Sequence, residues 1–193
     1  MDRTTLLSEL LTAHGPADSV ESEYRRQMLA LTESDGDPFS RRRFDPGHFT
    51  VSAFVLSPDG SSLLMIFHEK LRRWLQPGGH VEPSDRTLRA AARREVVEET
   101  GLPEAELVGD DPAAFDLDIH AIPQNEKEPG HLHHDLRFLF RVRSTPASHS
   151  GDRDDVRWVG LDQATALNPE PAMKRILKKL AATRSTIECQ EET

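Results

Sequence analysis

The sequence predicts a mixed α/β domain preceded by helices, and three patterns support this class. Short segments between residues 48 and 161 alternate apolar and polar residues with a period of two, which is typical of strands. A glutamate-rich helical pattern interrupts these strands after a glycine turn, and two further helical patterns precede the first strand. We therefore expect an N-terminal helical extension at 1–45, a strand-containing domain at 46–182 and a disordered tail at 183–193.

The N-terminal extension contains two expected helices. Residues 3–13 form an amphipathic pattern that ends at a His-Gly-Pro sequence. A second helix begins at Asp18, whose spacing to Glu21 fits a capping box, and continues to about Glu33. A last helix is expected at 171–182, where apolar residues recur at core spacing.

Five segments are expected to be strands. The first two, 48–55 and 62–68, are separated by a Pro-Asp-Gly turn and predict a hairpin. The other three expected strands are 114–122, 131–143 and 155–161. The segments 114–122 and 131–143 are connected by one polar loop, so they can pair antiparallel. The alternation in 114–122 places Asp116, Asp118 and His120 on one side. This side either neighbours the polar face of the strand 131–143 or is the solvated side of an edge strand, and we favour the second interpretation.

Charge and composition limit the classes of partner. The chain of 193 residues has a net charge of −9, which argues against nucleic acid as a partner, since surfaces that follow phosphates are basic. No apolar run approaches the length of a membrane span. The single cysteine, Cys189, cannot form an internal disulfide, so a cytoplasmic location without membrane contact is the default expectation.

The glutamate-rich helix carries the strongest functional signal. Glu95, Glu98 and Glu99 are spaced i, i+3 and i+4, so they lie on one helix face. The same face carries the apolar residues Leu88, Ala91, Ala92 and Leu102. Carboxylates crowded at the edge of a core repel one another and lose hydration, which is costly unless a cation neutralises them. A hard divalent ion, Mg²⁺ with Mn²⁺ as a possible substitute, would do so; a merely solvated acidic face is the alternative.

The segment around this helix resembles the Nudix hydrolases, whose box reads G-x5-E-x7-R-E-U-x-E-E-x-G-U, with U a bulky aliphatic residue. Residues 94–102, REVVEETGL, match its second half at every position. Gly79 and Asp85 match the first half with two departures: Asp replaces Glu, and the interval to Arg94 is one residue longer. In the family this acidic residue braces the box arginine, so the departures put that bracing in doubt.

The resemblance implies an α/β/α sandwich with a mixed sheet and a hydrolase that cleaves a P–O–P bond in a nucleoside diphosphate linked to another group. It implies Glu98 and Glu99 as metal ligands, Glu95 as a third ligand or as the general base, and Arg94 as the residue that orients them. The base could also come from outside the box, from Glu126, Glu128 or Asp135. A binding module of the same fold is the alternative function, and the N-terminal helices could form a homodimer. The sequence does not select among nucleotide substrates.

Further candidate residues lie around the box. Gly78 and Gly79 allow backbone to approach the helix closely, and Glu82 is a candidate contact to the metal site. On the strand 131–143, one face carries a row of polar side chains that could contact substrate phosphates, namely His131, His133, Asp135 and Arg137. The His-x-His pair is also a possible transition-metal pair, and exposed histidines without a function would give the same pattern.

Overall fold

The computed structural model describes residues 3–69, 71–109, 111–144 and 155–191, with backbone alone for 184–191. Its helices are α1 (Arg3–Ala13), α2 (Ser19–Thr32), α3 (Leu88–Thr100), α4 (Leu161–Leu167) and α5 (Pro171–Glu191), with a 3₁₀ turn at Glu104–Glu106. Its strands are β1 (Gly47–Leu56), β2 (Ser62–His68), β3 (Arg73–Leu75), β4 (Gly78–His80), β5 (Leu107–Val108), β6 (Asp116–Ile122), β7 (His131–Val142) and β8 (Val156–Gly160).

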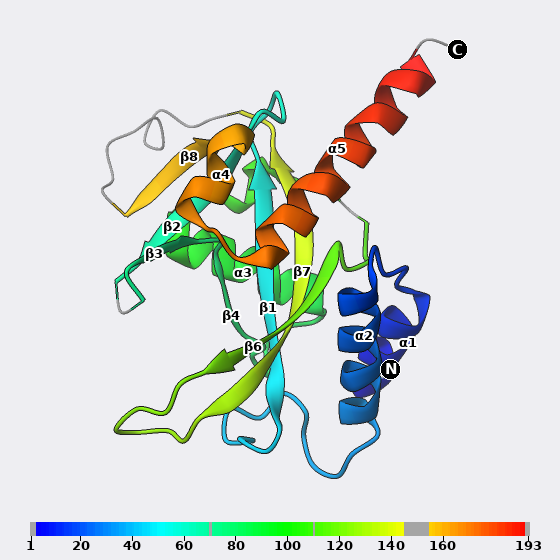
Figure 1. The fold of residues 1–193 in the computed structure, drawn as a ribbon, viewed down its shortest axis with the longest axis vertical. Helices are drawn as coiled ribbons and strands as arrows, with labels where there is room; N and C mark the ends of the chain where they lie inside the picture. Colours follow the sequence, from blue (N-terminus) through cyan, green and yellow to red (C-terminus); the bar gives the residue numbers. More distant parts are fainter. Residues whose placement is uncertain (1–2, 70, 110, 145–154, 192–193) are drawn as a thin grey trace.

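The strands form one mixed sheet (Figure 1). Its main path runs β3-β2-β1-β7-β5, and β4, β6 and β8 pair with β1, β7 and β2 respectively. The central pair β1–β7 is parallel from Gly47 to Leu56, whereas the other pairs are antiparallel. The expected antiparallel pairing of the segments around β6 and β7 is confirmed.

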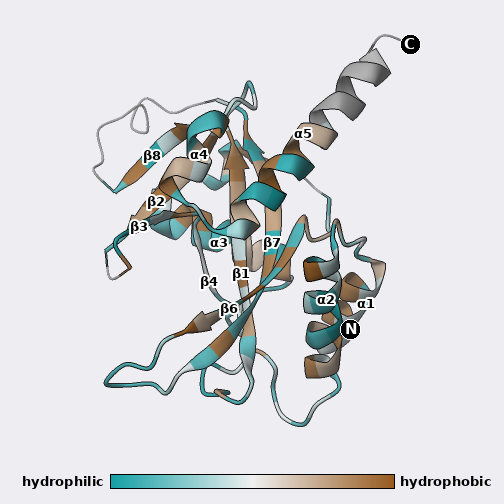
Figure 2. Cartoon of the chain, in the orientation of Figure 1, coloured by the Kyte–Doolittle hydropathy of each residue, from teal (hydrophilic) through white to brown (hydrophobic). Residues whose placement is uncertain are grey.

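Alternation along β1 divides the core between the two sheet faces. Phe49, Val51 and Ala53 are buried on the face covered by α3. Phe54 and Leu56 point to the other face, where α4 and α5 contribute a second apolar cluster. Figure 2 shows this inner part of β1 and β2 as hydrophobic, in contrast to the hydrophilic loop between β6 and β7. A mixed sheet with helices on both faces confirms the predicted fold class.

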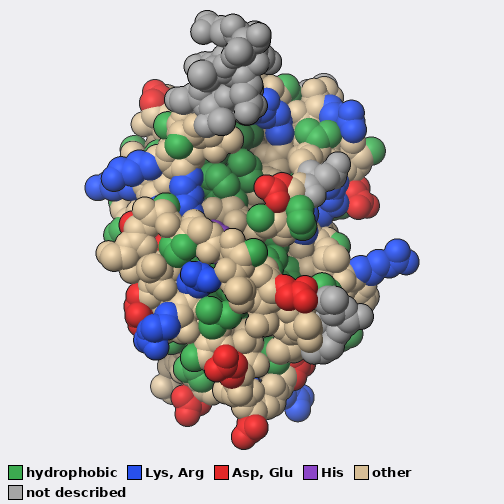
Figure 3. All heavy atoms as spheres, turned by 90° about the vertical axis from the view of Figure 1, so that its right-hand side faces the viewer, with side chains coloured by type: hydrophobic (Ala, Val, Ile, Leu, Met, Phe, Trp, Pro, Cys, Tyr) green, Lys and Arg blue, Asp and Glu red, His purple; other side chains and the backbone are tan. Residues whose placement is uncertain are grey.

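The N-terminal helices cover the side of the sheet next to β6 (Figure 1). Leu7 and Leu11 of α1, with Met28 and Leu31 of α2, belong to the same apolar cluster as Val96 of α3. Acidic and basic side chains are interspersed on the face that Figure 3 presents. None of the described helices combines the length and apolar character needed to cross a membrane.

The structure differs from the expected elements in five places. Strands β3, β4 and β5 have two or three residues, too few to show alternation in sequence, and α4 directly follows β8. Helix α5 continues to Glu191, through most of the segment 183–193 that was expected to be disordered. No proline or glycine follows Pro171 in this helix, so its sequence contains no stop signal. Residues 192 and 193 lie outside the described part of the chain.

Candidate active site

Helix α3 is fixed at both ends. The Thr87 side chain accepts a hydrogen bond from the Ala90 N–H, and Gly101 ends the helix in the left-handed conformation with φ of 72°. Its apolar side chains are buried against the sheet, namely Leu88, Ala91, Ala92 and Val96. This anchoring sets the rotation of the helix, so that the box glutamates lie at the margin of the buried stripe.

Glu95 and Glu99 face the short strand β4. The Gly78 N–H donates to the Glu99 carboxylate over 2.8 Å. A Cβ atom at Gly79 would lie 2.6 Å from the Glu95 carboxyl carbon. β4 pairs with β1 through Gly79 and Val51, which holds this backbone in the sheet. Glycine is therefore needed at Gly79 because the Glu95 carboxylate occupies the space of a side chain.

Arg94 connects the helix to the preceding loop. Its guanidinium makes two hydrogen bonds to Asp85, of 3.0 and 3.1 Å, and one of 2.9 Å to the His80 carbonyl. It also donates to Glu95 over 2.8 Å and to Glu98 over 3.1 Å. Asp85 therefore braces the arginine despite being shorter than the glutamate of the family pattern. The extra residue between Asp85 and Arg94 therefore does not prevent this loop from reaching the guanidinium.

The site holds more negative charge than its arginine balances. Arg94 pairs with Asp85, Glu95 and Glu98, and Glu99 lies beside the same group. Burial, reinforced by the charges of Glu95 and Glu98, raises the pKa of Glu99 to about 7. Burial also raises the pKa of Glu95. Crowded, partly desolvated carboxylate oxygens form a donor set that suits a hard divalent cation, so the residues present fit the magnesium that the box implies.

Two predicted residues outside the helix are buried among protein partners. Asp135 and Arg137 are 3% and 6% exposed, and they bond to each other over 3.1 Å. Asp135 also accepts hydrogen bonds from Thr50 and Ser52, of 3.1 and 2.7 Å. Both side chains are thus buried and bonded to protein partners, and their contact with substrate stays a prediction. The role of Asp135 as the base also stays a prediction.

The expected solvated side of β6 is wrong for its two aspartates, whereas His120 is exposed. The alternative, in which this side neighbours the polar face of β7, is confirmed by the pairing of the two strands. Asp116 is completely buried and Asp118 is 7% exposed. Arg137 donates to Asp118 over 2.8 Å, and Arg175 of α5 makes bonds of 2.7 and 2.9 Å to Asp116. Two arginines from other elements therefore neutralise these aspartates, and at these two positions the side chains of β7 and α5 replace water.

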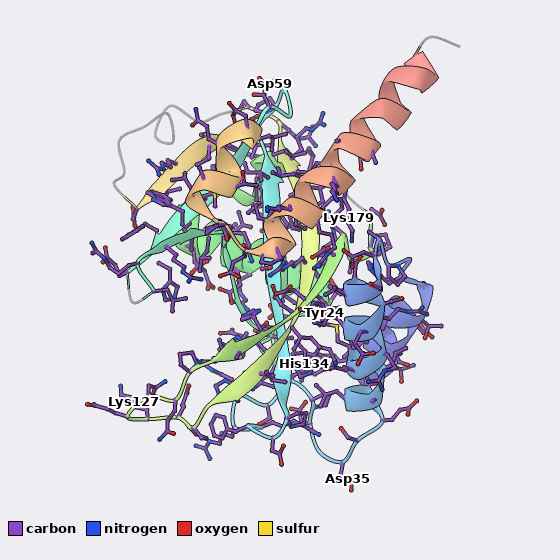
Figure 4. The ribbon with its side chains drawn as sticks, in the orientation of Figure 1. Tyr24, Asp35, Asp59, Lys127, His134 and Lys179 are labelled. Carbon is purple, nitrogen blue, oxygen red and sulfur yellow. The ribbon has the colours of Figure 1, made fainter. Side chains whose placement is uncertain are left out.

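This buried charge network continues into the N-terminal helices. Lys179 of α5 lies 2.9 Å from Asp116 and 2.5 Å from Glu21 of α2. Glu21 also accepts hydrogen bonds from the backbone of Ala17 and Leu117. Figure 4 labels Lys179 on α5 and Tyr24 on α2, which lie on the two sides of this junction. Sequence reasoning used Glu21 only as a capping residue and missed the network.

The remaining predicted residues have mixed positions. Glu82 is exposed, and its backbone N–H donates to Asp85, so its metal contact stays a prediction. His131 and His133 lie on one sheet face as expected, with His48 of β1 and His80 of β4 beside them. The latter two were missed. Alternation along β1 offered the signal for His48, but nothing in the sequence placed His80 next to β1.

Two cavities lie away from the glutamates. One, of about 360 Å³, lies between α1 and the start of α3 and includes Leu6, Val81 and Leu88 in its lining. The other, of about 740 Å³, lies between the α1–α2 turn and α5. Neither is lined by Glu95, Glu98 or Glu99. Volume alone therefore does not indicate the reaction site, whereas the charge arrangement does.

A NUDIX domain model matches residues 46–180. The chain belongs to the Nudix family. It is thus a Nudix-type hydrolase acting on phosphoric anhydrides, as the box predicted. No curated protein matches the chain.

Solved structures similar to this Nudix chain come from several organisms. An Ap4A hydrolase of C. elegans is 18% identical, with 70% of this chain and 96% of that chain covered and a TM-score of 0.49. A NUDIX family hydrolase of Clostridium perfringens is 22% identical, with 70% and 97% covered and a TM-score of 0.48. The E. coli dihydroneopterin triphosphate pyrophosphohydrolase is 15% identical, with 68% and 92% covered and a TM-score of 0.49.

Proposed function

We propose that this Nudix protein is a Mg²⁺-dependent pyrophosphohydrolase that cleaves a P–O–P bond in a nucleoside diphosphate linked to another moiety. The observation that supports this function is the excess of carboxylate charge at the end of α3. Burial and mutual repulsion raise the pKa of Glu99 to about 7, which shows how strongly the site disfavours its own charges. A divalent cation relieves this repulsion and brings a polyanionic substrate to an acidic protein.

The box glutamates would hold the ion, with Glu98 and Glu99 as the first ligands and Glu95 beside them. Glu98 has a side chain that is 56% exposed, so its carboxylate can be reached from solvent. When bound, Mg²⁺ neutralises phosphate charge and lowers the pKa of a coordinated water. Arg94 holds Glu95 and Glu98 in position through its hydrogen bonds.

Hydrolysis also needs a group that accepts a proton from the attacking water. Glu95 and Glu99 both have raised pKa values because of their burial. A carboxylate whose pKa is raised is a stronger base than an ordinary glutamate. We assign this role to Glu95, because Glu98 and Glu99 would hold the ion.

The test combines a substrate panel with one variant and a matched control. Dinucleoside polyphosphates, ADP-ribose, nucleotide sugars and oxidised nucleoside triphosphates are incubated with Mg²⁺ or Mn²⁺, and products are identified by chromatography. Glu99→Gln keeps the shape of the side chain and removes its charge, so turnover should fall by about 10³-fold or more. The control is Glu104→Gln, an exposed glutamate just after α3, which should keep wild-type turnover.

Two results would contradict the proposal. One is near-wild-type turnover by Glu99→Gln on an identified substrate. The other is nucleotide binding by the wild-type protein without any Mg²⁺-dependent cleavage across the panel, which would favour the alternative of a binding module.

A further inference from the structure

A group of histidines lies on the sheet face opposite α3, where β1, β4 and β7 run side by side. His48 is opposite His133 in the parallel β1–β7 register. His80 is opposite Thr50, the next residue of β1 on the same face as His48. Because side chains alternate across a strand, the three imidazoles project from one face. Three strands that are distant in sequence thus bring one ring each to the same place.

The ring nitrogens of this group are close enough to share one ion. Within the described residues, one ligand atom from each of His48, His80 and His133 lies within 4.8 Å of the others. The Nε2 atoms of His48 and His80 are 3.1 Å apart. Nitrogens bound to one tetrahedral zinc at its usual bond length are about 3.3 Å apart. Small side-chain rotations would therefore bring all three nitrogens to bonding distance.

The backbone orients His48 for such a role. Its Nδ1 lies 3.0 Å from the Arg43 carbonyl, which fixes the ring and leaves Nε2 facing His80. A hydrogen bond from the second ring nitrogen to a carbonyl is the common outer support of metal-bound histidines. His131 lies beside the group, with its Nδ1 2.9 Å from the Pro129 carbonyl and its Nε2 3.3 Å from that of His133, but it is not one of the three whose ligand atoms all lie within 4.8 Å of one another.

The protonation state also suits a metal ion. Burial, together with the nearby charge of Arg41, lowers the pKa of His80 to about 4. Burial and the neighbouring histidines lower the pKa of His133 to about 2, and burial lowers that of His48. The rings are thus neutral at pH 7, which is the form that binds metals without first losing a proton.

We propose that His48, His80 and His133 bind one borderline divalent ion of the zinc class, with the fourth coordination position left to water. Three neutral imidazoles favour zinc, cobalt or nickel over Mg²⁺, which prefers oxygen ligands. The ion is additional to the one expected at the box glutamates. It ties β4 to β1 and β7, and the His80 carbonyl in turn accepts a hydrogen bond from Arg94. It therefore fixes the strand on which the box glutamates rest.

The experiment measures metal uptake with excess Mg²⁺ present to occupy the box glutamates. Zinc binding is followed by calorimetry and by metal content per chain, and cobalt binding by its visible absorption. The wild-type protein should bind one ion, and His80→Gln and His133→Gln should lose affinity by on the order of 100-fold or more, since loss of an outer partner alone costs about 10–100-fold. The matched control is His120→Gln: its ring lies 5.5 Å from that of His133, outside the group of three, and it should bind zinc as the wild type does.

Two further measurements separate this site from folding effects and from the box. Circular dichroism and melting temperature in EDTA should be the same for the wild type and the glutamine variants, whereas zinc should raise the melting temperature of the wild type and of His120→Gln. Glu99→Gln should keep its zinc uptake. The proposal fails if the wild type takes up no zinc or if His80→Gln and His133→Gln bind as tightly as the wild type. It also fails if Glu99→Gln loses the ion while His133→Gln keeps it.

Discussion

Two groups of carboxylates, one at the end of α3 and one beneath α5, differ in how their charge is balanced. At the box, Arg94 is surrounded by several carboxylates, and the pKa values of Glu95 and Glu99 are raised. In the buried network, burial alone would raise the pKa of Asp118, but Arg137 and other partners lower it. The difference teaches that unbalanced charge, rather than the number of acidic residues, distinguishes a binding site from a structural one.

The geometry of the two groups agrees with this distinction. Asp116 contacts Arg175, Arg137 and Lys179 and is completely buried. Its charge is satisfied by partners from two other elements, so a ligand has nothing to add. Glu99 instead accepts a backbone hydrogen bond from Gly78 and is repelled by Glu95 and Glu98. A cation bound beside Glu99 would therefore stabilise the folded protein.

Breaking the balanced group should have the largest effect on folding. Arg137→Met removes a buried cation and leaves the buried Asp135 and Asp118 with fewer partners for their charge. We expect the free energy of unfolding to fall by about 3–5 kcal/mol, measured by urea denaturation. The control is Arg141→Met on the same strand, where the side chain is exposed and the change should stay within about 0.5 kcal/mol. A loss below about 1 kcal/mol for Arg137→Met would show that the network is not structural.

Displacing one carboxylate of the unbalanced group should affect turnover more than stability. The Cβ added by Gly79→Ala would meet the Glu95 carboxylate, the mobile end of a side chain that can move aside. We expect turnover to fall by about 10²-fold, because misplacing a reacting group by about 1 Å has that effect, with a small change in melting temperature.

Substitutions of two other glycines serve as controls for this prediction. Gly78→Ala would place its Cβ 2.7 Å from the Val51 carbonyl oxygen, a backbone atom that cannot move aside, so it should lose stability as well as turnover. Gly15→Ala meets no atom within 4 Å and should leave both unchanged. If Gly79→Ala keeps full turnover, the position of Glu95 does not matter for the reaction.

Removing charge from the unbalanced group should stabilise the metal-free protein in a pH-dependent manner. The pKa of Glu99 is about 7 in the folded protein and near the ordinary glutamate value of 4.5 in the unfolded chain, so the folded protein holds an extra proton between these pH values. That contribution to stability is lost as the pH rises toward 7. In EDTA, Glu99→Gln should therefore exceed the wild type by about 1–2 kcal/mol at pH 8, after allowing for solvent screening, and by little at pH 4.

Thermal denaturation across this pH range measures the difference. Mg²⁺ should reverse the order of stability of the two proteins, because it should stabilise the wild type alone. Equal stability of the two proteins at pH 8 in EDTA would show that the site does not penalise its own charge.

Sequence reasoning reached the unbalanced group because it is local. The glutamates, their helix and its Gly101 terminus lie within one short segment, where spacing alone places side chains on a face. The balanced group could not be predicted in this way. Glu21 and Lys179 are 158 residues apart, and whether a carboxylate on β6 meets water or a cation depends on where α5 is placed. For the same reason, His131 and His133 were noticed but His48 and His80 were not.

The attachment of Glu21 has a practical consequence for anyone who wishes to shorten this protein. The family match begins at residue 46, yet the first two helices supply Leu7, Leu11, Met28 and Leu31 to the main core. A chain trimmed to the matched region would lose that packing and would leave the Lys179 ammonium without its glutamate. Shortened or fused versions of the protein should therefore retain the first two helices, because these helices pack into the same core as α3.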